Sequence, residues 1–290
     1  MKKYSLQHTL NKPVSFSGIG VHSGKETDII IRPAPENHGI RFRRTDIPGT
    51  SDIQAIFKKV VDTSLATVVG ENGAIVSTIE HLMAAFAGLG IDNALVEINA
   101  YEMPIMDGSA EEFTFRMMDA GITEQKALKY FFVVTSCVRV VAGEKFVEIE
   151  PGPGFKISCS IEFDNPLIGA QELTFDSATD NFFQDISRAR TFGFIKDIEY
   201  LKKFSLGRGG SLKNAVVIDE DRILNTEGLR YPDEFVRHKL LDCLGDFSLL
   251  GMPIQGHVKT NKSGHALNHA FITKFLKEKN SWETRPVLME

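Results

Sequence analysis

The chain has 290 residues, of which 42% are hydrophobic and 24% charged, and its formal net charge of −5 does not suggest a broad nucleic-acid-binding surface. Its three cysteines form no C-x-x-C pair, which argues for a reducing compartment and against a disulfide framework or a cysteine-rich zinc site. No apolar segment follows the basic N-terminus or reaches the roughly 18–20 residues that span a bilayer, so we expect no signal peptide, no transmembrane segment and a cytoplasmic protein.

The first half of the chain predicts strands followed by helices. β-branched and alternating segments indicate strands, an Asn-Gly pair indicates a hairpin, and Gly121 ends an amphipathic helix. In chain order, the expected elements are strands over 28–32 and 40–43, a hairpin at 71–73, a helix over 77–86 that stops at 88–90, a strand over 94–98 and a helix ending near 120.

The same order then recurs in the second half. The expected elements are a strand and turn over 137–145, a strand over 147–150, a helix around His238 that ends at Gly251, a strand over 255–259 and a closing helix. Strands followed by helices favour α+β layers over a doubly wound parallel sheet. We therefore predict an internal duplication of two α+β domains, 1–127 and 128–290, each with strands layered on helices. A ligand pocket at their interface would bring His81 and His238 together.

Two predicted helices carry candidate metal ligands. His238, Asp242 and Asp246 fall at i, i+4 and i+8, so they share one helix face. A single H-x-x-x-D is more often part of a polar stripe that faces water, but the upstream helix offers His81 as a third ligand. Two histidines and one carboxylate, with a fourth position open to water, are typical of a catalytic zinc site.

Further polar residues lie close to these ligands in the sequence. Glu80 precedes His81 and is a candidate general base, although a first-turn acid that faces the helix dipole is the common alternative. His265 lies in a Gly-flanked loop, where most histidines are simply exposed. The predicted duplication returns it to the interface, where Asp246 would orient it. Lys239 would bind an anionic substrate group.

Five segments together resemble a known enzyme family. They run in the family's order along essentially the whole chain: Ser77-Thr78-Ile79-Glu80-His81-Leu82-Met83-Ala84-Ala85, Met103-Pro104-Ile105-Met106-Asp107-Gly108-Ser109, Ser187-Arg188-Ala189-Arg190-Thr191-Phe192-Gly193-Phe194, Glu234-Phe235-Val236-Arg237-His238-Lys239-Leu240-Leu241-Asp242 and Lys262-Ser263-Gly264-His265-Ala266-Leu267. The chain closely resembles the UDP-3-O-acyl-N-acetylglucosamine deacetylases, the zinc amidases of lipid A synthesis in Gram-negative bacteria.

The resemblance implies hydrolysis of the acetamide of a UDP-linked, 3-O-acylated glucosamine, the committed step of lipid A synthesis. It further implies Zn²⁺, or Fe²⁺ in the cell, and a monomer with at most weak membrane proximity. The roles that it implies are metal ligation by His81, His238 and Asp242, general base for Glu80, general acid or electrostatic stabiliser for His265 with support from Asp246, oxyanion stabilisation by Thr191, and sugar-nucleotide contacts by Phe192 and Lys239.

An insert near 191–218 carries the remaining substrate-binding prediction. Its apolar pattern predicts a helix over 194–205 and a strand over 215–218. An apolar face of this kind commonly packs into the protein core. The family resemblance instead implies a passage for the 3-O-acyl chain, lined by Phe194, Ile198, Ala215 and Val217.

Two other classes of function fit parts of this pattern. One is a different metal-dependent hydrolase, such as a peptidase, and the other is a sugar-nucleotide-binding protein with a structural metal. Glu80 and His265 argue against the second, because binding alone requires neither. Release of acetate from the UDP-sugar distinguishes all three.

Overall fold

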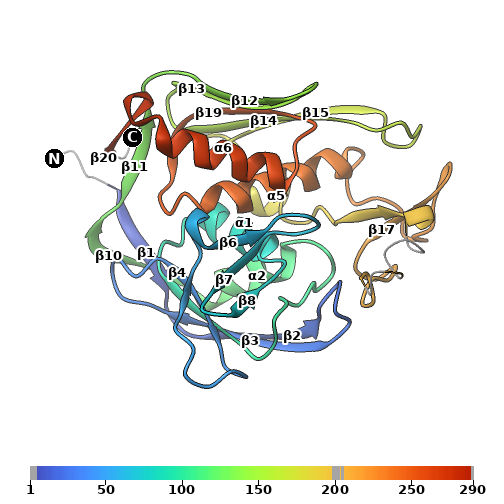
Figure 1. Ribbon diagram of the computed structural model, residues 1–290, viewed down its shortest axis with the longest axis horizontal. Helices are drawn as coiled ribbons and strands as arrows, with labels where there is room; N and C mark the ends of the chain where they lie inside the picture. Colours follow the sequence, from blue (N-terminus) through green and yellow to red (C-terminus); the bar gives the residue numbers. More distant parts are fainter. Residues whose placement is uncertain (1–4, 198–202, 204–205, 289–290) are drawn as a thin grey trace.

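The computed structural model describes residues 5–197, 203 and 206–288. Figure 1 shows two outer sheets with helices layered between them, so the α+β prediction is confirmed. None of the described helices is long and apolar enough to cross a membrane.

The first sheet has the strand order β2-β3-β9-β4-β5. Its strands are β2 (Val14–Ile19), β3 (Glu26–Pro33), β9 (Ala94–Ile98), β4 (Ile40–Arg44) and β5 (Ile53–Gln54). All neighbours are antiparallel except β9 and β4, which are parallel. Along β3, Ile29 and Ile31 are buried while Asp28 is exposed, because alternate side chains point to opposite faces. The buried face packs towards α1 (Glu80–Leu89) and α2 (Glu111–Ala120).

The second sheet repeats this arrangement. β12 (Val138–Ala142), β13 (Lys145–Glu150), β19 (Ile254–Asn261), β14 (Phe155–Glu162) and β15 (Ala170–Asp176) pair in that order, again with one parallel pair, β19 and β14. β19 also pairs with β11 (Tyr130–Val134), which pairs with β20 (Trp282–Pro286). The helices α5 (Glu234–Ser248) and α6 (His265–Lys277) cover its inner face.

The two sheets therefore share one strand order and one set of strand directions. This match supports an internal duplication, which stays a prediction together with its domain boundary. The predicted boundary at residue 127 falls inside β10 (Ile122–Leu128), which pairs with β1 (Leu6–Leu10).

Smaller elements lie between these within the described residues. Asn72 and Gly73 both have positive φ, at 50° and 83°, and form the predicted hairpin between β7 and β8. The remaining elements are η1 (Phe57–Lys59), β6 (Val60–Asp62), β7 (Val68–Glu71), β8 (Ala74–Val76), α3 (Phe182–Asp185), β16 (Phe192–Phe194), β17 (Val216–Asp219), β18 (Arg222–Ile223) and η2 (Lys279–Ser281).

Three predicted helix boundaries are wrong. The first helix begins at Glu80 and not at residue 77, because Thr78 has a φ of 60°, outside the right-handed helical region. The helix around His238 ends at Ser248, after which a turn leads to Gly251. Phe194 ends β16, which pairs with β17, so the helical residues begin at Ile195 and are described only for 195–197 and 203.

The inner helices α1 and α5 pack closely against one another. A Cβ atom added at Gly245 would lie 2.1 Å from the carbonyl oxygen of Glu80, so only glycine allows this approach of the two backbones. The contact brings the start of α1, with Glu80 and His81, against the face of α5 that carries His238, Asp242 and Asp246.

Candidate metal and catalytic centre

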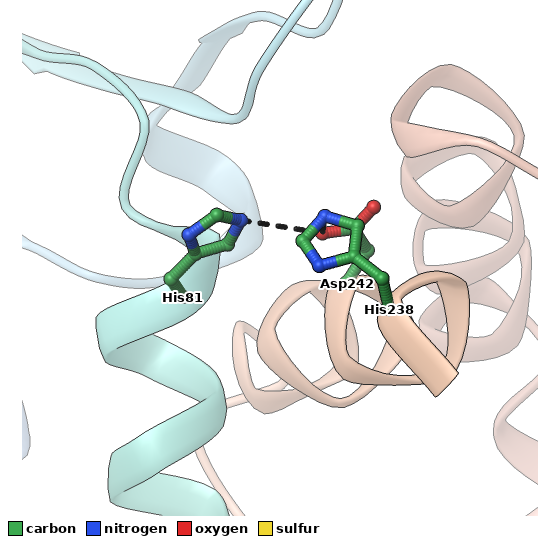
Figure 2. Close-up of side chains that lie close together, drawn as sticks. All are labelled: His81, His238 and Asp242. Carbon is green, nitrogen blue, oxygen red and sulfur yellow. Dashed lines mark ion pairs between the residues drawn. The ribbon is translucent and has the colours of Figure 1, made fainter. Parts of the chain in front are cut away.

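His81 from α1 and His238 and Asp242 from α5 meet between the two helices (Figure 2), with all three side chains buried. The Nε2 atoms of His81 and His238 lie 3.7 and 3.4 Å from Oδ1 of Asp242. A tetrahedral Zn²⁺ with bonds of about 2.0–2.1 Å holds its ligand atoms about 3.4 Å apart. The spacing of these donor atoms therefore fits one small cation.

Neighbouring groups fix the orientation of two of these side chains. Nδ1 of His238 lies 3.1 Å from the carbonyl oxygen of Ala189, which directs the Nδ1–H there and leaves the Nε2 lone pair towards Asp242. The ammonium of Lys239 donates to Oδ2 of Asp242 at 2.9 Å, so Oδ1 is the oxygen that faces the histidines. Nδ1 of His81 is buried and has no hydrogen-bond partner within the described part of the chain.

The protonation states of these three side chains also suit metal binding. Burial lowers the pKa of His81 to about 3 and also lowers the pKa of His238, so both imidazoles are neutral near pH 7. Burial alone would raise the pKa of Asp242, but its electrostatic interactions with His238 and with the ammonium of Lys239 outweigh burial and hold that pKa below its usual range. Two neutral imidazoles and a carboxylate are a donor set that suits Zn²⁺.

Glu80, Asp246 and His265 lie beside these ligands. Oε1 of Glu80 is 3.8 Å from Nε2 of His265, and Nδ1 of His265 is 2.8 Å from Oδ2 of Asp246. Glu80 lies in the first turn of α1, where it is buried and its Oε2 accepts the backbone N–H of Thr67 at 3.1 Å. His265 opens α6 and is largely covered, so it is not an exposed loop histidine.

Glu80 and His265 carry opposite pKa shifts. Burial raises the pKa of Glu80 to about 7. Burial alone would lower the pKa of His265, but the negative charge and hydrogen bond of Asp246 outweigh it and raise that pKa to about 10. A carboxylate that accepts a proton near neutral pH thus faces an imidazolium that keeps its proton. Pairs of this kind are typical of general acid–base catalysis.

Thr191 and Phe192 connect the centre to the insert. Thr191 donates its N–H to the carbonyl of Gly108 at 2.7 Å, and its own carbonyl accepts the N–H of Val216 at 2.8 Å. The ring of Phe192 lies 6.3 Å from that of His238, and the ammonium of Lys239 lies 5.7 Å from the Phe192 ring centroid. The structure therefore brings Phe192 next to His238 and Lys239 next to Asp242, while the backbone contacts of Thr191 are with Gly108 and Val216.

The predicted passage residues are only partly accounted for. Phe194, Ala215 and Val217 are half-buried, while Val216 and Ile218 are buried in the core. The strand predicted over 215–218 is β17 (Val216–Asp219), so Ala215 directly precedes the strand and does not belong to it. Ile198 lies outside the described residues. A role in binding the acyl chain stays a prediction for all four.

Sequence reasoning missed several groups at the centre. Thr67 donates its hydroxyl to Oδ1 of Asp246 at 2.6 Å, and the segment around it carries no local signal of that contact. The buried guanidinium of Arg190 pairs with the buried carboxylate of Glu234 at 2.9 Å, next to the Ala189 carbonyl that His238 uses. A buried charge requires a partner of opposite charge. The presence of Arg190 inside one of the five segments therefore indicated that an acidic residue would pair with it.

Comparison with known proteins identifies the family of this chain. Residues 7–277 match the sequence profile of the family described as UDP-3-O-acyl N-acetylglycosamine deacetylase. The chain is 50% identical to the UDP-3-O-acyl-N-acetylglucosamine deacetylase of Myxococcus xanthus over 97% of this chain and 89% of the relative. It is 48% identical to the enzyme of the same name from Acidithiobacillus ferrooxidans, over 96% of this chain and 92% of the relative. The chain belongs to the UDP-3-O-acyl N-acetylglycosamine deacetylase family.

Proposed function

We propose that His81, His238 and Asp242 hold a zinc ion, and that this is where the chain carries out its family's reaction. That reaction is hydrolysis of the N-acetyl group of UDP-3-O-acyl-N-acetylglucosamine, a step of lipid A synthesis, to UDP-3-O-acyl-glucosamine and acetate. The observation that carries the proposal is the meeting of three buried donor atoms with an acid–base pair in one space. Fe²⁺ is the alternative ion, because imidazole and carboxylate ligands suit both metals.

The side chains divide the proton transfers between them. When bound, the metal supplies a Lewis acid that polarises the acetamide carbonyl and lowers the pKa of a water. Glu80 takes the proton of the attacking water as the new C–O bond forms. His265 gives its proton to the amide nitrogen as the C–N bond breaks, and Asp246 stabilises its imidazolium. The hydroxyl of Thr191 stabilises the negative charge that develops on the carbonyl oxygen.

The remaining substrate contacts follow from the neighbours of the metal ligands. Phe192 would stack against the sugar and Lys239 would attract the anionic part of the UDP-sugar, since both side chains lie beside His238 or Asp242. Monomeric state, cytoplasmic location and weak membrane proximity stay predictions.

Acetate release from two substrates tests the reaction. The purified, zinc-loaded protein should release acetate from UDP-3-O-acyl-N-acetylglucosamine and none from an N-acetylated peptide, because the proposed contacts recognise the sugar-nucleotide. Cleavage of peptide bonds would favour the other hydrolase, and substrate binding without acetate release would favour a binding protein.

The rate should depend on pH in a bell shape. Below its pKa of about 7 Glu80 is protonated and cannot act as a base, and above its pKa of about 10 His265 has lost the proton that it donates. A bound cation favours the carboxylate and disfavours the imidazolium, so both limbs should lie below these values in the loaded enzyme. Turnover measured from about pH 5 to 10 checks this, and a flat profile would contradict the pairing.

The passage for the acyl chain is testable at Ala215. Ala215→Trp should raise KM for a long-chain substrate far more than for a short-acyl analogue, because each buried methylene adds up to about 0.8 kcal/mol of binding free energy. The exposed residue Ala142 on β12 provides a matched control, and Ala142→Trp should change neither KM. An equal rise in KM for both substrates in the Ala215 variant would show that this segment does not bind the acyl chain.

A further inference from the structure

We infer that Thr67 is a positioning residue that holds the general base and the general acid in one geometry. The inference rests on the proposed roles of Glu80 and His265 and assigns a task to a residue outside the motifs. Thr67 is buried and directly precedes β7, a strand of the small β6-β7-β8 sheet, whereas Asp246 and His265 come from α5 and α6.

The backbone of Thr67 fixes the start of α1. Its N–H donates to Oε2 of Glu80 at 3.1 Å, and its carbonyl accepts the N–H of Ile79 at 3.3 Å. With Oε2 held by Thr67, the other oxygen, Oε1, is the one that faces His265. The peptide group of Thr67 therefore selects which oxygen of Glu80 is directed at the reaction.

The side chain of Thr67 fixes the acid through Asp246. Its hydroxyl donates to Oδ1 of Asp246 at 2.6 Å and lies 3.3 Å from Nδ1 of His265. The other oxygen, Oδ2, accepts from Nδ1 of His265 and from Nδ2 of Asn268, both at 2.8 Å. Thr67 thus prevents the carboxylate from rotating about its Cβ–Cγ bond, and that rotation would turn the His265 ring. Carboxylates that orient a catalytic histidine act through such fixed hydrogen bonds.

The backbone N–H of Thr67 bonds to Glu80 and its hydroxyl bonds to Asp246, so a substitution can remove the hydroxyl alone. Thr67→Val keeps the shape and both backbone bonds but removes the hydroxyl, and with it the hydrogen bond to Asp246 and the contact with His265. We expect kcat to fall by about 10- to 100-fold, the usual cost of losing a group that orients a reacting side chain, with KM and metal content unchanged. Thr67→Ser keeps the hydroxyl and should retain most of the wild-type kcat.

A second buried threonine provides the control. Thr114 on α2 is buried, and its hydroxyl donates to the carbonyl of Ala110, which its own N–H also contacts. Thr114→Val should leave kcat unchanged, so a fall specific to residue 67 cannot be a general effect of removing a buried hydroxyl.

The outcomes separate the inference from the function on which it rests. Wild-type acetate release and its loss in Glu80→Gln establish the function independently of Thr67. A normal kcat in Thr67→Val would overturn the inference. So would an equal loss in Thr67→Ser and Thr67→Val, because the hydroxyl would then not be the group that matters. If Thr67→Val unfolds at a lower temperature than Thr114→Val, the Ser variant decides: preserved kcat supports the inference, and lost kcat overturns it.

Discussion

Replacing His238 with alanine should remove both the bound metal and the turnover. His238 supplies one of three protein donor atoms, and its Nε2 lies 3.4 Å from the Asp242 oxygen that faces the same space. Two remaining ligands make a poor site for Zn²⁺. Removing a group that only orients a metal ligand costs roughly 10- to 100-fold in activity. Removing the ligand His238 itself should cost more. Metal analysis of the purified variant, together with acetate release, measures both effects.

A histidine on the second sheet, which contacts none of the metal ligands, provides the control for this variant. His257 lies on β19 and bonds with Ser158 and Glu150, so His257→Ala should keep metal and turnover. Thermal unfolding should show that the His238 variant remains folded, because α5 keeps its apolar contacts through Phe235, Leu240 and Leu241. Full metal occupancy with full activity in His238→Ala would end the ligand assignment.

Replacing Glu80 with glutamine should keep the metal and lower kcat by about 10²- to 10⁴-fold, the usual scale for a positioned general base. Glutamine has nearly the same shape, and its amide oxygen can still accept the N–H of Thr67, so the start of α1 should not move. It cannot take a proton from water at neutral pH. Steady-state kinetics with metal analysis separates this loss of chemistry from a loss of metal.

A matched glutamate tests whether the effect is specific. Glu97 on β9 pairs with Arg32 and Arg43, and Glu97→Gln should leave kcat unchanged. Near-normal turnover in Glu80→Gln would show that another group accepts the proton.

The helical period predicted the part of the site that lies on one helix. Spacings of four residues bring His238, Asp242 and Asp246 to one face of α5 regardless of the rest of the fold. The meeting with His81 needed a second argument, from the repeated order of elements. Asp246 and His265 were expected to pair, and their 2.8 Å contact agrees with that expectation.

Contacts made by backbone groups could not be predicted in this way. The carbonyl of Ala189 and the N–H of Thr67 bond to His238 and Glu80 from loops, and any residue type offers these groups. Helix starts and strand ends were also beyond sequence reasoning. Thr78 leaves the helical region to accommodate the loop before α1, and Phe194 joins β17 through tertiary pairing that overrides its local pattern.

Acetate release during return of zinc to the metal-free protein tests the proposed centre most directly. Activity should rise in proportion to bound zinc and saturate at one ion per chain, because His81, His238 and Asp242 form a site for a single ion. Turnover by the metal-free protein, or saturation of the site without acetate release, would contradict this expectation.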